Sequence, residues 1–131
     1  MIEFSAMFPV MVTENLGQVK SFYETIFGFK SVYYQEGFYL HLVSIESGVQ
    51  LGFLVPNHPS QPEFLHRLMD PGGYVMSLEV TDAAKAYEQA KEFNMLISMS
   101  LKEEVWGQIH FMVEDPSGIN IDIVQHQAIA E

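Results

Sequence analysis

The stretch QIHFMVEDPSGINIDIVQ, residues 108–125, decides the fold, because it predicts two β-strands joined by a tight turn. Apolar residues alternate along residues 108–114 and 119–125, which is the pattern of strands that bury one face. Asp115-Pro116-Ser117-Gly118 supplies the residue types that such a turn needs. The isoleucines at 119, 121 and 123 are expected in the core. The side chains expected on the opposite face are Gln108, His110, Met112, Asn120, Asp122 and Val124.

The rest of this half of the chain predicts a strand, a helix and another strand. Residues 74–80 and 96–101 have the apolar and β-branched composition of strands. Between them, apolar residues recur at helical spacing from Ala83 to Phe93, and Asp82 stands where an N-cap residue is expected. The order is therefore strand, helix and three strands.

The first half of the chain shows the same order. A strand is predicted at residues 7–13, and Asn15 followed by Gln18 suggests a capping box at the start of a helix. Gly28 stands where a left-handed residue would end that helix. Three strands are then expected, followed by a linker at residues 56–62 and a short helical piece at 63–69. These strands span residues 29–35, 38–45 and 49–55.

Two such halves make an α+β protein with two βαβββ repeats, at about residues 5–56 and 73–126. Each repeat has one helix for one sheet, so one face of each sheet stays uncovered. We expect a single domain over residues 1–131, with a curved mixed sheet around a cleft.

Composition excludes several classes of function. The formal charge of −11 repels nucleic acid and anionic membrane surfaces, so neither is expected as a partner. The sequence has no cysteine, which excludes disulfides and thiolate chemistry and fits a cytoplasmic location. It contains no signal-peptide pattern and no stretch as long as a membrane span.

A polar cluster is predicted on the uncovered face of the second sheet. Strand alternation places Glu79 there together with Gln108, His110 and Asp122. Such positions are often only solvated, but four of them on one face favour a binding cavity. His41 lies between Leu40 and Leu42 and is a weaker member of the set, because a structural or exposed histidine is the commoner explanation.

Two sets of residues resemble the vicinal-oxygen-chelate superfamily, which includes glyoxalases, bleomycin-resistance proteins and dioxygenases. One is PVMV at residues 9–12 followed by SFYETIFGF at 21–29. The other is WGQ at residues 106–108 followed by EDPSGIN at 114–120, which is closest to the bleomycin-resistance-like proteins. The resemblance covers nearly the whole chain and implies the glyoxalase/bleomycin resistance fold.

Enzymes of this superfamily bind a divalent metal ion at four strand positions. The resemblance places Phe8, Gly52, Val75 and Asp122 at those positions, so three of the four lack a donor atom. We therefore expect no metal cofactor and no catalytic residues of the usual kind, since a catalytic metal needs about three protein ligands. The alternative is a displaced site for one divalent metal, formed by Glu79, His110 and Asp122, in a lyase, isomerase or dioxygenase.

The bleomycin-resistance-like proteins imply a binding function instead. They sequester a flat cationic drug in grooves between two subunits, and Tyr33, Phe38 and Trp106 match their aromatic positions. We thus expect a homodimer that binds an aromatic or cationic small molecule, as in antibiotic resistance. A regulatory module that binds a metabolite or a protein is a further alternative. The expected ligand-binding residues are Tyr33, Phe38, His41, Glu79, Trp106, Gln108, His110 and Asp122.

Overall fold

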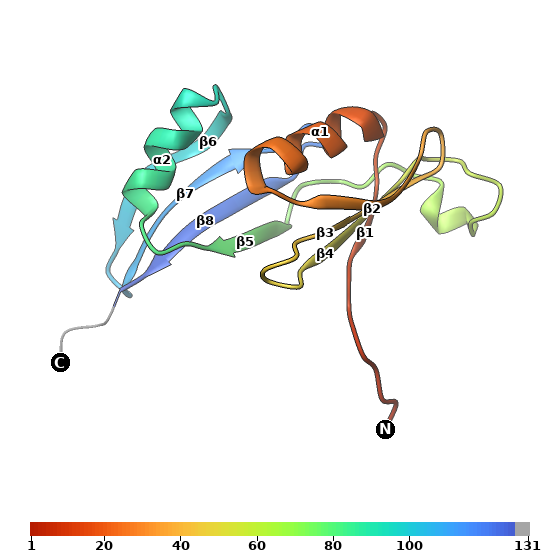
Figure 1. Ribbon diagram of the computed structural model, residues 1–131, viewed down its shortest axis with the longest axis horizontal. Helices are drawn as coiled ribbons and strands as arrows, with labels where there is room; N and C mark the ends of the chain where they lie inside the picture. Colours follow the sequence, from red (N-terminus) through yellow and green to blue (C-terminus); the bar gives the residue numbers. More distant parts are fainter. Residues whose placement is uncertain (128–131) are drawn as a thin grey trace. The chain divides into compact units, whose positions relative to one another are not determined.

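The computed structural model describes residues 1–127, which form two compact units. The first unit comprises residues 1–70, and the second begins at residue 71. Each unit contains one βαβββ repeat with a four-stranded mixed sheet and one helix (Figure 1). The α+β class and the two repeats expected from the sequence are therefore confirmed. That the two halves form one domain around a cleft stays a prediction.

In the first unit, the strand order is β1-β4-β3-β2. Strands β1 and β4 are parallel, whereas β4, β3 and β2 are antiparallel neighbours. A short 3-10 helix, η1 (Glu63–Leu65), follows the last strand. The other elements are β1 (Val10–Val12), α1 (Leu16–Phe27), β2 (Lys30–Gln35), β3 (Tyr39–Val43) and β4 (Gln50–Leu54).

Helix α1 covers one face of this sheet (Figure 1). Leu40 and Leu42 alternate along β3 and are fully buried, and Phe53 of β4 lies beside them in register. Tyr23 of α1 packs on Phe53 with ring centroids 5.7 Å apart. Because alternate residues of a strand point to opposite faces, Tyr39 and His41 lie on the face away from the helix.

The two ends of α1 differ in how well the sequence predicted them. Gly28 has a φ of 69° and ends the helix, as expected. Asn15 precedes the helix but adopts the left-handed conformation and makes no side-chain capping bond, so the capping-box prediction was wrong. Its backbone carbonyl instead accepts the N–H groups of Gln18 and Val19.

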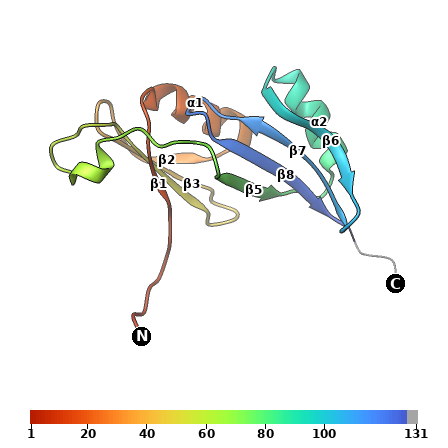
Figure 2. The ribbon, with the colours of Figure 1, turned by 180° about the vertical axis from the view of Figure 1, so that it is seen from behind.

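The first strand is shorter than residues 7–13. Only Val10–Val12 pairs with β4, and the residues before it run away from the sheet as an extended segment (Figures 1 and 2). Pro9 lacks an N–H group and directly precedes the strand, although its carbonyl still accepts a bond from Gly52 N–H. The apolar side chains of Ile2, Phe4 and Met7 remain exposed.

In the second unit, the strand order is β5-β8-β7-β6, with β5 and β8 parallel and the other pairs antiparallel. Strand β6 extends three residues past the expected end at 101, because its pairing with β7 continues beyond two register shifts. The elements are β5 (Val75–Glu79), α2 (Ala83–Glu92), β6 (Leu96–Glu104), β7 (Gln108–Glu114) and β8 (Asn120–His126).

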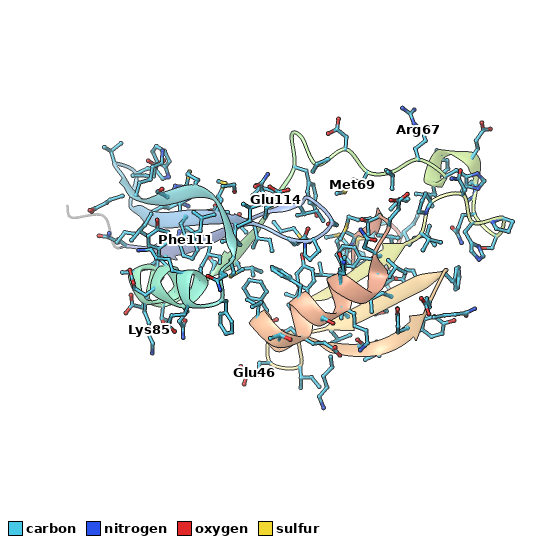
Figure 3. The ribbon with its side chains drawn as sticks, turned by 90° about the horizontal axis from the view of Figure 1, so that it is seen from above. Glu46, Arg67, Met69, Lys85, Phe111 and Glu114 are labelled. Carbon is cyan, nitrogen blue, oxygen red and sulfur yellow. The ribbon has the colours of Figure 1, made fainter. Side chains whose placement is uncertain are left out.

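The core of this unit lies between the sheet and α2. Phe111 is fully buried, points towards α2 and contacts the ring of Tyr87 at 5.0 Å between centroids (Figure 3). Ile121 is likewise fully buried, as the alternation predicted. Asp82 caps α2 by accepting the backbone N–H of Lys85 at 3.0 Å, which confirms the expected N-cap.

The turn between β7 and β8 is held by one buried carboxylate. Asp115 Oδ1 accepts the backbone N–H groups of Ser117 and Ile119 at 2.8 and 3.0 Å, and the Ser117 hydroxyl at 2.6 Å. Gly118 takes a φ of 92°, which favours glycine. This turn sets the register of β7 and β8 and thereby aligns His110 and Asp122 on one face.

Candidate functional site

A chain of polar side chains crosses the uncovered face of the second sheet. His110 Nδ1 lies 2.8 Å from Asp122 Oδ1, and both residues are buried, with exposed fractions of 6% and 9%. His110 Nε2 lies 3.5 Å from Glu104 Oε2, whose other oxygen is 3.2 Å from Lys102 Nζ. The cluster therefore runs from Asp122 on β8 through His110 on β7 to Glu104 and Lys102 on β6.

The contacts of His110 limit its chemistry. Asp122 holds one ring nitrogen, and the ring is fixed in orientation by this bond. Nε2 faces Glu104 near the limit of an ion pair, without forming a hydrogen bond. The hydroxyl of Ser77 lies 3.5 Å from Asp122 and bonds to this carboxylate rather than to the imidazole, so the three residues do not have the order of a Ser-His-Asp triad.

The other predicted polar residues of this sheet lie apart from the pair. Glu79 is exposed and contacts His126 Nε2, so the structure does not group it with His110 and Asp122. Gln108 accepts a hydrogen bond from Trp106 Nε1 at 2.9 Å. The expected four-residue cluster thus divides into a buried His110–Asp122 pair and an exposed rim.

Trp106 lies in the turn between β6 and β7 and is 57% exposed. The hydrogen bond from its Nε1 to Gln108 places this ring beside the exposed polar side chains of the sheet.

The uncovered face of the first sheet carries a row of rings, here called the aromatic row. Tyr33 contacts Phe38 and Tyr39, at 6.5 and 6.2 Å between centroids. Tyr39 in turn contacts His41, and Phe8 meets His41 edge-on at 4.6 Å. At the other end of the row, Phe38 lies 4.4 Å from the ring of His58. The row brings together the predicted residues Tyr33, Phe38 and His41.

Hydrogen bonds fix two members of the aromatic row. The Tyr39 hydroxyl lies 2.7 Å from His41 Nδ1, and His41 Nε2 lies 2.7 Å from Gln50 Oε1. Burial raises the pKa of Tyr39 above its ordinary value, so its hydroxyl keeps its proton at neutral pH. Both ring nitrogens of His41 thus have partners within the first sheet, as a structural histidine would, and a role in ligand binding stays a prediction.

Sequence reasoning missed Phe8 and Tyr39 as parts of this row, and Glu104 as a neighbour of His110. Tyr39 had a usable signal, because it is two residues before His41 and must share its face of the strand. Glu104 had no such signal in the sequence, since this strand was expected to end at residue 101.

A separate pocket of about 450 Å³ lies in the first unit at the start of α1. It adjoins none of the predicted ligand-binding residues. Its lining is formed by Glu14, Asn15, Leu16, Gly17, Gln18, Tyr34, Glu36, Gly37, Val55 and Pro56.

The residues present do not fit the divalent metal of the superfamily's enzymes. Phe8, Gly52 and Val75 have no donor side chain, and a Cβ added to Gly52 would lie 2.3 Å from the Tyr39 hydroxyl. Asp122 is already bonded to His110. Within residues 1–127, no group of three His, Asp or Glu side chains is arranged to hold a metal ion. A displaced site would also need Glu79, which lies with His126 instead.

Comparison with known proteins defines the class of the chain. Residues 7–123 match the model of the glyoxalase/bleomycin resistance protein/dioxygenase superfamily. The chain therefore belongs to this superfamily. A search of curated proteins gave no match.

Three solved structures illustrate the similarity. TnmS3, an antibiotic-binding protein from Streptomyces, is 20% identical with a TM-score of 0.71, and the match covers 97% of this chain and 99% of that one. A bleomycin resistance determinant encoded on transposon Tn5 is 20% identical with a TM-score of 0.65, over 95% and 100% of the two chains. A lactoylglutathione lyase from Agrobacterium tumefaciens is 15% identical with a TM-score of 0.70, over 92% of each. At these identities the likeness shows the fold alone.

We predict that the buried pair contributes measurably to stability. Replacing Asp122 with Ala leaves the His110 ring without its acceptor and should lower the free energy of unfolding by about 3 kcal/mol. In a double-mutant cycle with His110→Ala, the two losses should be non-additive. Urea denaturation followed by circular dichroism measures both quantities.

The exposed pair of Glu79 and His126 provides the control in the same sheet. Glu79→Ala should cost less than about 1 kcal/mol, because the pair is open to solvent. Equal losses for Asp122→Ala and Glu79→Ala, or additive losses in the cycle, would contradict the structural role assigned to the buried pair.

Proposed function

We propose that the protein is a metal-independent binding protein for a planar aromatic or cationic small molecule such as an antibiotic. The observation that carries this proposal is the aromatic row on the uncovered face of the first sheet. Tyr33 is 46% exposed and Phe8 is 42% exposed, although both are large and partly apolar. Partly exposed rings held by neighbouring rings offer flat surfaces on which another ring can stack.

The charge of the protein supports a cationic ligand. Seventeen acidic residues against six basic ones give a negative field that raises the local concentration of cations. Aromatic faces also attract cations through their quadrupole, with about 0.5–2 kcal/mol per contact. The described antibiotic-binding and bleomycin-resistance relatives share the fold, which is compatible with this ligand class.

The donor set supports binding without a metal. Three of the four strand positions that bind metal in the superfamily's enzymes lack donors, and the Tyr39 hydroxyl fills the space beside Gly52. The proposed displaced site for a lyase, isomerase or dioxygenase lacks a third ligand close to His110 and Asp122. Binding is therefore favoured over metal-dependent catalysis.

The aromatic row predicts which substitutions weaken ligand binding. Proflavine, acridine orange and bleomycin are suitable probes, because each presents planar aromatic rings. Tyr33→Ala and Phe38→Ala should each weaken binding about ten-fold, since each removes a stacking surface. Isothermal titration calorimetry measures the dissociation constants.

Phe64→Ala is the matched control, because Phe64 is an aromatic residue of η1, outside the aromatic row, and is 75% exposed. It should leave affinity unchanged. No binding of any of the three probes to the native protein, or equal losses in all three variants, would overturn the proposal.

Metal independence makes a second prediction. Protein purified without an affinity tag, and then exposed to zinc, nickel, manganese or iron, should retain far less than one metal ion per chain after dialysis. Elemental analysis measures this content. Ligand affinity should also be the same with and without EDTA. One tightly held ion per chain that is lost in His110→Ala or Asp122→Ala would favour the enzyme alternative.

A homodimer remains part of the proposal. Its support is the segment before β1, where Ile2, Phe4 and Met7 are 91%, 81% and 83% exposed. Exposed apolar side chains in one segment are a common feature of protein–protein contacts.

A cytoplasmic location is likewise proposed, because the sequence contains no cysteine. Within residues 1–127, no helix is long and apolar enough to cross a membrane.

Sedimentation velocity tests the dimer directly. At about ten micromolar protein, the expected mass is twice that of the 14.9 kDa chain. The double variant Ile2→Ser and Phe4→Ser should shift the mass towards the monomer, because it removes apolar contact area. Ile45→Ser is the control, since Ile45 is also exposed but lies in the turn after β3. A monomer mass for the native protein would refute the dimer.

A further inference from the structure

The placement of the Gln50 amide sets the direction of the hydrogen bonds around Tyr39. Gln50 presents its carbonyl oxygen to His41 Nε2 at 2.7 Å, so Nε2 carries the proton of the neutral imidazole. His41 Nδ1 is then an acceptor, and the Tyr39 hydroxyl donates its proton to it at 2.7 Å. The remaining lone pairs of the Tyr39 oxygen can only accept.

Gly52 leaves the space that this hydroxyl occupies. Its φ is not positive, so the backbone does not require glycine at this position. A Cβ on Gly52 would instead lie 2.3 Å from Tyr39 Oη, 3.0 Å from Cζ and 3.1 Å from a methyl group of Val10. Glycine is therefore explained by the close approach of the Tyr39 hydroxyl to the strand, and not by a turn.

The oriented hydroxyl lies within the aromatic row. Tyr39 contacts the rings of Tyr33, Phe38 and His41, and burial raises its pKa, so it remains a neutral hydroxyl over the physiological range. A ring that stacks on Tyr33 would have its edge near polar groups of the same face. The Tyr39 hydroxyl already donates its proton to His41 Nδ1, so its oxygen can only accept a further hydrogen bond.

We infer that Tyr39, oriented by His41 and Gln50, is a specificity-determining residue that selects aromatic ligands with an N–H or O–H donor at the ring edge. This inference rests on the proposed binding function and adds the polarity of the ligand to it. A ligand that supplies the donor gains a hydrogen bond. A ligand of the same shape without the donor leaves the part-buried oxygen without this additional hydrogen bond and binds more weakly.

The direction of the hydrogen bonds is measurable without any ligand. Two-bond ¹H–¹⁵N correlation spectra of the imidazole rings distinguish the two neutral tautomers. For His41 we expect the proton on Nε2 at pH 8. The signals of the His41 ring are assigned by their loss from the spectrum of His41→Gln. A proton on Nδ1 would reverse the polarity of the Tyr39 hydroxyl and overturn the inference.

The selectivity test uses the ring-N-methylated forms of proflavine and acridine orange, named here by the parent dyes, which are planar cations with the same ring system and no ring N–H group. Proflavine has two amino groups with N–H donors, whereas acridine orange has dimethylamino groups in their place. The native protein should bind proflavine about ten-fold more tightly. Tyr39→Phe should remove most of this preference, because it deletes the accepting oxygen and keeps the ring. Fluorescence titration gives both dissociation constants.

Two control variants separate the hydroxyl from other effects. Tyr34→Phe also removes a hydroxyl from the same strand region, but Tyr34 pairs in register with buried Leu40 on the helix side of the sheet, so the preference should persist. Gln50→Glu keeps an acceptor for His41 Nε2 and should retain the preference, whereas Gln50→Leu should reduce it. A preference that survives in Tyr39→Phe would be steric and would overturn the inference.

The outcomes distinguish this inference from the proposed function. If both dyes bind equally, and Tyr33→Ala weakens both, the binding function stands and the selecting role of Tyr39 is refuted. If neither dye nor bleomycin binds, the proposed function fails and the inference fails with it. A preference for proflavine that depends on Tyr39 and not on Tyr34 supports both.

Discussion

The structure depends on the alternation of side chains along β-strands that are covered on only one face. Each unit has four strands and a single α-helix, so one set of alternate side chains faces that helix and the other set points away from it. Leu40 and Leu42 illustrate the first set, and Tyr39 and His41 the second. Shifting a strand by one residue would exchange these sets, so burial of the leucines also fixes the positions of the polar groups.

The two uncovered faces use this constraint differently. The first sheet carries rings and a chain of hydrogen bonds from Tyr39 through His41 to Gln50. The second sheet carries the buried pair of His110 and Asp122 with carboxylate and ammonium neighbours. Burying such a pair requires good hydrogen-bond geometry, because desolvation is costly. The first face offers rings on which another ring can stack. The polar groups of the second face are instead paired with one another.

Gly52 and Asp122 are two of the positions that the resemblance to the superfamily's enzymes compares with metal ligands. In this chain, glycine at position 52 admits the hydroxyl of Tyr39 from the neighbouring strand. Asp122 has a carboxylate that could bind a metal ion, but this carboxylate is hydrogen-bonded to His110. Membership of the superfamily is therefore compatible with a function that needs no metal, since function resides in the site and not in the fold.

The sequence by itself determined the order of elements, the buried set of each strand and the family. Periodicity placed Ile121 and Phe111 in the core, and the residue types at Asp82, Gly28 and Asp115 marked the caps and the turn, because these signals act over a few neighbouring residues. Prediction from the sequence failed for the capping box at Asn15, because capping depends on the local backbone conformation. It also failed for the start of β1, because the length of a strand depends on its partner strand.

Only the tertiary structure decided which polar residues meet. Sequence alternation put Glu79 and His110 on the same face, but could not specify the distances across strands, and the structure places Glu79 with His126 and brings Glu104 to His110 instead. Likewise, the contact of Tyr39 with Gly52 joins residues on adjacent strands through their register. Alternation fixes the face of a side chain, whereas pairing register and rotamer fix its neighbours, and these arise only when the whole sheet is assembled.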